Sequence, residues 1–83
     1  MTQSNPLISR ITVNPKVMLG KPTIRGMRIT VEQILKSLSA GISQQDLIDE
    51  YPELEAKDFQ AVFAYVAALG QLPLLNHRFR RGL

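Results

Sequence analysis

Gly20-Lys21-Pro22-Thr23-Ile24-Arg25-Gly26-Met27-Arg28-Ile29-Thr30-Val31 is the run around which the rest of this 83-residue chain is organised. Its two glycines and its proline predict turns. Its apolar residues are spaced as the buried side of a small hairpin. Thr30 is a good N-cap, and Gln33 follows it at the spacing of a capping box. The run therefore predicts a turn, short extended segments and the start of the first helix.

A short β-hairpin is expected before the helices. Ile11-Thr12-Val13 is β-branched and alternating, which indicates a strand that ends at Asn14-Pro15. Thr23-Ile24 and Arg28-Ile29 are expected to be extended on either side of the turn between them. A hairpin of this size is too small to be stable alone, so it must pack on helices.

Three helices are predicted after the hairpin. The first runs from about Val31 to Ser39, where apolar residues recur at helical spacing and Gly41 provides a stop. The second begins after Ser43, whose hydroxyl can cap it. The third runs from Glu55 or Ala56 to Leu69. We therefore predict a mainly α domain with the proportions of a helix-turn-helix, preceded by a short β-hairpin.

The third helix is apolar nearly all round, with Gln60 as its strongly polar residue between Phe59 and Leu69. A surface helix normally has one apolar stripe of limited width. Either the hairpin or a second subunit must cover the rest of this helix, and we favour a symmetric homodimer. The residues expected at its interface are Phe59, Val62, Phe63 and Val66.

Charge is unevenly distributed along the chain. Residues 1–30 contain five basic residues and no acid, residues 31–70 contain all seven acids, and residues 71–83 contain three arginines. One interpretation is an electropositive surface for an anionic partner. The other is that the basic and acidic segments attract each other within the domain or across a dimer. Both interpretations stay open at this point.

Composition argues against several classes of protein. The chain has no cysteine and a single histidine, His77, and its acids are expected mostly on exposed helix ends, so we expect no enzyme, no metal site and no cofactor. No apolar run has the length of a membrane span, and the N-terminus lacks the regions of a signal peptide. We expect a cytoplasmic protein that does not contact a membrane.

The start of the third helix carries Glu55 and Asp58 and no arginine, so this helix is not expected to read DNA bases. If DNA is bound, the phosphate contacts are expected from the basic N-terminal residues, namely Arg10, Lys16, Lys21, Arg25 and Arg28. The alternative for Lys21, Arg25 and Arg28 is that they pair with acids of the second and third helices.

The chain divides into an N-terminal arm at residues 1–9, a domain at residues 10–70 and a tail at residues 71–83. The tail is first apolar and then basic. It is either a frayed terminus or a segment that orders on a partner. On the second interpretation its partner-binding residues are Leu72, Leu74, Leu75, Phe79, Arg80 and Arg81.

Several runs, taken together, resemble a small bacterial family catalogued as domain of unknown function 433, often described as antitoxin-like. These are Ile11-Thr12-Val13-Asn14-Pro15, the run Gly20 to Val31, Ala40-Gly41-Ile42-Ser43 and Tyr51-Pro52-Glu53-Leu54. The resemblance covers residues 10 to 68. It implies a homeodomain-type three-helix fold after a β-hairpin, and a role as an antitoxin that binds a PIN-like ribonuclease toxin. Binding of operator DNA stays open, and the alternative is a dimeric protein-interaction module with no DNA binding. The chain departs from the family at Leu19, where a glycine is frequent.

Overall fold

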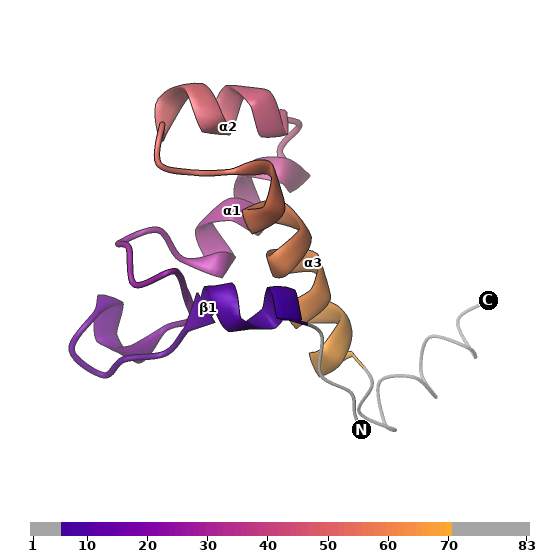
Figure 1. The fold of residues 1–83 in the computed structure, drawn as a ribbon. Coiled ribbons are helices and arrows are strands. Elements are labelled where there is room, and N and C mark those ends of the chain that lie inside the picture. The colour runs from indigo at the N-terminus through magenta and orange to yellow at the C-terminus, as the bar shows by residue number, and fades with distance from the viewer. Residues whose placement is uncertain (1–5, 71–83) are drawn as a thin grey trace.

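The computed structural model describes residues 6–70, which form three α-helices after a short two-stranded sheet (Figure 1). The predicted fold class is therefore confirmed. In chain order the elements are η1 (Pro6–Arg10), β1 (Ile11–Thr12), η2 (Met18–Gly20), β2 (Thr23–Ile24), α1 (Val31–Ser39), α2 (Gln44–Glu50) and α3 (Ala56–Leu69).

The sheet is a minimal antiparallel pair in which Ile11 lies opposite Ile24. After β2 the chain turns sharply through Arg25 and Gly26, whose φ angles are 47° and 75°. The Met27 N–H donates to the Ile24 carbonyl at 2.8 Å, which closes the turn. Two successive positive φ angles are the pattern of a type I′ turn, which suits a twisted hairpin. The segment expected to be extended at Arg28-Ile29 is not part of a strand, but it does pair with β2: the Ile24 N–H donates to the Ile29 carbonyl at 3.0 Å, and Thr30 forms an isolated antiparallel bridge with Thr23.

The helix starts follow the predicted caps. The Thr30 side chain accepts a hydrogen bond from the Gln33 N–H at 2.9 Å, and α1 occupies the predicted residues. Ser43 likewise accepts from the Asp46 N–H at 3.0 Å and starts α2. These caps satisfy N–H groups that the first turn of each helix leaves unpaired.

One hydrophobic core joins the hairpin to all three helices. It receives the apolar side of the Gly20–Val31 run and the first half of α3. Its buried members are Ile24, Ile29, Val31, Ile34, Leu47, Leu54, Phe59 and Val62. Phe59 and Val62 have an exposed fraction of 0%, so the single chain already covers them completely. Assigning these two side chains to a dimer interface is therefore wrong, because neither offers any surface to a partner.

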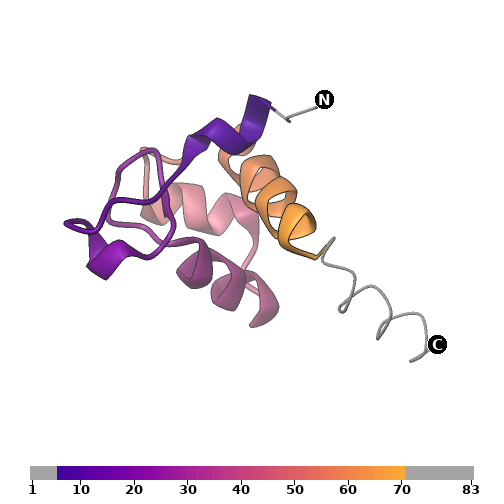
Figure 2. The same cartoon turned by 90° about the horizontal axis from the view of Figure 1, so that it is seen from below.

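The segment before the sheet also differs from expectation. Pro6–Arg10 forms the 3₁₀ helix η1, which lies beside α3 in both views (Figure 2). Residues 6–9, which the sequence places in the predicted N-terminal arm, are therefore part of this helix. This segment covers part of the α3 surface for which the sequence suggested either the hairpin or a second subunit.

Candidate functional site

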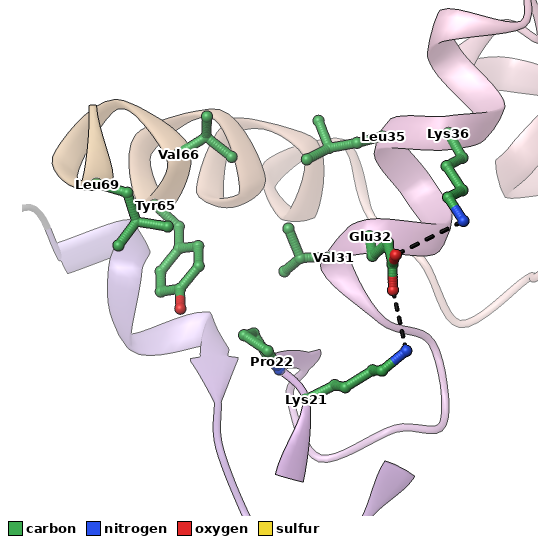
Figure 3. Close-up of a pocket in the computed structure, with 9 residues that line it drawn as sticks. All are labelled: Lys21, Pro22, Val31, Glu32, Leu35, Lys36, Tyr65, Val66 and Leu69. Atoms are coloured by element: carbon green, nitrogen blue, oxygen red, sulfur yellow. Dashed lines mark hydrogen bonds and ion pairs between the residues drawn. The ribbon is translucent and has the colours of Figure 1, made fainter. Parts of the chain in front are cut away.

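An open apolar groove of about 360 Å³ lies between α1 and the second half of α3 (Figure 3). Tyr65, Val66 and Leu69 form its α3 side, and Val31 and Leu35 form its α1 side. Pro22, just before β2, lines it as well. Helical spacing explains the α3 side, since residues three and four apart lie on neighbouring turns of one face. The groove is a surface hollow lined mainly by apolar side chains.

The groove continues into an exposed apolar stripe on α3. Phe63, Val66 and Leu69 are 46%, 38% and 50% exposed, respectively. Their spacing of three residues places them on successive turns of the helix. In contrast, the buried residues of α3 all lie in its first half, between Asp58 and Val62. In the C-terminal half of α3, Tyr65 still packs against the core, whereas Phe63, Val66 and Leu69 leave much of their apolar surface uncovered.

Ion pairs run along one rim of the groove. Glu32 accepts a hydrogen bond from Lys21 at 3.1 Å and lies 3.6 Å from the Lys36 ammonium (Figure 3). The hydrogen bond from Lys21, with the charges of both lysines, lowers the pKa of Glu32. All three side chains are more than half exposed, so these pairs contribute little to stability.

A second cluster of charges is centred on Asp58, whose side chain is fully buried. Its carboxylate accepts from Arg10 at 2.9 Å, from Arg25 at 3.0 Å and 2.9 Å, and from the Glu55 N–H at 2.8 Å. Arg25 also donates to the Glu53 carbonyl at 2.6 Å. Burial acts to raise the pKa of Asp58, but the hydrogen bonds from Arg25, Glu55 and Arg10 outweigh it, and the pKa is lowered.

This cluster ties three distant segments together: the end of η1, the turn after β2 and the start of α3. It corrects the expectation that Asp58 is an exposed acid at a helix end. It also accounts for Arg25 at a turn position with positive φ, where a side chain is disfavoured, because the guanidinium reaches the buried carboxylate from there. The pairing of Arg25 agrees with the second interpretation of the basic run, in which its cations bind acids of the later helices.

The other expected phosphate-binding cations lie apart from this cluster. Lys16, Lys21 and Arg28 surround a hollow of about 390 Å³ that is also lined by Pro15, Met18 and Leu19. Among the described residues, Lys16 and Arg28 form no ion pair, and Lys21 pairs with Glu32. The five predicted cations therefore fall into two sets, of which Arg10 and Arg25 hold the fold together.

Other expected site residues are placed only in part. Phe63 and Val66 are on the surface, as an interface requires. The predicted partner-binding residues lie outside the described residues 6–70, namely Leu72, Leu74, Leu75, Phe79, Arg80 and Arg81. Sequence reasoning missed Tyr65 and Leu69 as groove residues. Tyr65 and Leu69 lie one and three residues from Val66, so their spacing could have indicated that they share its side of α3. The α1 side of the groove could not be predicted in this way, because it depends on how the helices pack.

Two further features are absent from residues 6–70. No group of three or more His, Cys, Asp or Glu side chains there is arranged to hold a metal ion. None of the helices in the same range combines the length and the hydrophobicity required to cross a bilayer.

Comparison with known proteins gives the chain its family. The family described as "Protein of unknown function (DUF433)" matches residues 11–66. The chain belongs to the DUF433 family. The match begins at β1 and ends at Val66 in the groove. It contains the hairpin, Asp58 with its partner Arg25, and most of the groove, whereas Arg10 lies just before it.

Among curated proteins, this DUF433 domain is similar to the "Uncharacterized protein y4eO" of Sinorhizobium fredii (strain NBRC 101917 / NGR234). The two are 29% identical over 58 residues, which cover 70% of this chain and 26% of the relative. The chain thus spans about a quarter of the length of that relative. No solved structure matches the chain.

Proposed function

We propose that this DUF433 domain is a protein-interaction module that acts as the antitoxin of a toxin–antitoxin pair, with a PIN-like ribonuclease as its partner. The observation that carries the proposal is the uncovered apolar side of α3, where the Phe63–Val66–Leu69 stripe meets a groove of about 360 Å³. The identity of the partner comes from the family resemblance.

The stripe is suited to a protein partner. Burying a large apolar side chain completely contributes about 1.5–3 kcal/mol, so covering the half-exposed Phe63 and Leu69 contributes about 1 kcal/mol each. The groove adds a concave surface, into which a helix of a partner can place apolar side chains. The charged rim at Glu32 leaves the edge of the contact hydrated, as is usual for interfaces.

Co-purification tests this proposal directly. The proposal predicts that a gene for a PIN-like ribonuclease lies beside the gene of this chain. The chain is co-expressed with that ribonuclease, and the complex is captured through the ribonuclease. Val66→Glu and Leu69→Glu each place a carboxylate in the groove and are expected to abolish capture. Ala68→Glu is the matched control, because Ala68 is exposed on the same turns of α3 and does not line the groove. Equal capture of all three variants would exclude the groove as the binding site.

A second copy of the chain is the competing occupant of the same surface. A homodimer built on Phe63 and Val66 gives twice the mass of one chain in solution, measured by light scattering during gel filtration. Val66→Glu is then expected to yield monomers. A monomeric wild-type protein would exclude the homodimer, and the ribonuclease would then be the one proposed partner for the stripe.

Operator DNA is the second partner in the proposal, and the hollow among Lys16, Lys21 and Arg28 favours it. Each phosphate contact contributes about 0.9 to the slope of log affinity against log salt concentration. The double variant Lys16→Glu/Arg28→Glu is expected to lose binding. Glu32→Gln is expected to strengthen it, because Lys21 is then free of its acid partner. If no duplex is retained at low salt, the domain is an interaction module without DNA contact.

A further inference from the structure

The loop between the two strands has an unusual backbone for its sequence. Met18 and Leu19 have φ angles of 49° and 59°, in the left-handed region that side chains disfavour, and Gly20 follows at 81°. Hydrogen bonds inside the loop hold this conformation, from the Gly20 N–H to the Val17 carbonyl at 3.0 Å and from the Lys21 N–H to the Met18 carbonyl at 3.1 Å. Strained backbone of this kind tends to occur at functional sites.

This backbone conformation leaves the side chain of Leu19 exposed to solvent. Leu19 is 94% exposed, the highest value among the large apolar side chains of residues 6–70. An isolated exposed leucine is common on protein surfaces. Leu19 differs because the loop that presents it is both strained and closed by its own hydrogen bonds. The side chain is therefore held at the surface by a closed loop and buries almost none of its area against the rest of the domain.

Three cations line the same hollow as this leucine. Leu19 lines the same hollow as Lys16, Lys21 and Arg28, which face no acid there except Glu32 beside Lys21. An exposed apolar tip beside cations is suited to a partner that is anionic outside and accepts an apolar group inside. Duplex DNA has both properties, since phosphates border its minor groove and proteins insert leucine between its stacked bases.

We infer that Leu19 is a wedge that enters the minor groove of duplex DNA and partly unstacks one base step, while Lys16, Lys21 and Arg28 bind the flanking phosphates. This inference rests on the DNA-binding part of the proposed function and names its binding mode. A membrane surface suits the same charges less well, because one leucine buries too little apolar area to anchor a domain stably.

The experiment compares two DNA duplexes of equal length and charge by fluorescence anisotropy. One has a central TA step, which unstacks easily, and the other is a stiff A-tract. Wild-type protein is expected to bind the TA duplex more tightly and to bend it, as measured by energy transfer between dyes at its ends. Leu19→Ala is expected to weaken binding to the TA duplex about tenfold, to remove the preference and to leave the salt slope unchanged.

Matched controls separate the wedge from general effects. Ile42→Ala removes an exposed apolar side chain at the turn before α2, and Lys57→Glu reverses an exposed charge on α3. Neither change is expected to alter the preference or the bending. The melting temperature of each variant is measured to check that it is folded. Leu19→Ala is expected to melt close to wild type, because Leu19 makes little contact with the core.

The outcomes separate this inference from the proposed function. The wedge would be overturned if the protein bound DNA in a salt-dependent manner without bending it and if Leu19→Ala bound as tightly as wild type. The proposed phosphate contacts would still be supported by that result. No binding to either duplex would overturn the wedge together with the DNA part of the proposal, and capture of the ribonuclease would be unaffected. Binding to phosphatidylserine vesicles in place of DNA, lost in Leu19→Ala, would also overturn the inference.

Discussion

Replacing Asp58 by asparagine tests the central role of the buried carboxylate. The substitution keeps the size of the side chain and removes its charge, so that an amide N–H₂ faces the guanidinium donors of Arg10 and Arg25. Breaking a buried ion pair by removing one partner costs about 3–5 kcal/mol. The two arginine side chains are 25% and 34% exposed and keep part of their hydration, which lowers our expectation to about 2–3 kcal/mol.

Urea unfolding followed by circular dichroism measures this cost. With an m value of about 1 kcal/mol/M for a small domain, the midpoint is expected to fall by about 2–3 M. Asp46→Asn is the matched control, because Asp46 occupies the same position after the cap of α2 and is exposed. Its expected cost is about 0.5 kcal/mol or less. If the two variants differ by less than about 0.5 kcal/mol, the Asp58 cluster does not hold the fold together as argued.

Three other predictions concern the acid stability of the Asp58 cluster, the turn at Arg25 and the Thr30 cap of α1. The pKa of Asp58 in the folded protein is lowered below 3.8, so the ionised carboxylate stabilises the fold fully above that pH. This contribution is lost as pH falls through the folded pKa. The stabilities of wild type and Asp58→Asn, measured by acid unfolding, should therefore converge at low pH. Arg25→Gly should unfold at higher urea than Arg25→Ala by the equivalent of about 1 kcal/mol, since both lose the ion pair and only glycine relieves the positive φ. Thr30→Ala should cost about 1 kcal/mol in the same assay through loss of the α1 cap, whereas Ser39→Ala at the exposed end of α1 should cost almost nothing; equal costs would contradict the capping argument.

The groove and the hollow lined by Lys16, Lys21 and Arg28 share one residue. Lys21 lines both, and it is held by Glu32 on the rim of the groove. A partner that engages Glu32 would release Lys21 for phosphate. Measuring the DNA salt slope with and without the bound ribonuclease would show this coupling as an increase of about 0.9.

Local sequence was sufficient for the helices and the buried side of the hairpin. The caps at Thr30 and Ser43 each bond to an N–H three residues away, so a short window of sequence contains both partners. Ile24 and Ile29 were likewise assignable to the core from alternation around the turn.

Tertiary structure alone decided which charges are structural and which surfaces stay open. Arg10 and Arg25 meet Asp58 across 48 and 33 residues of sequence, and in the sequence they do not differ from Lys16 or Arg28. The groove likewise depends on α1 packing beside α3, and the exposure of Leu19 depends on a backbone fixed by the whole loop. Contacts of this kind join residues far apart in the chain, and spacing within one element carries no information about them.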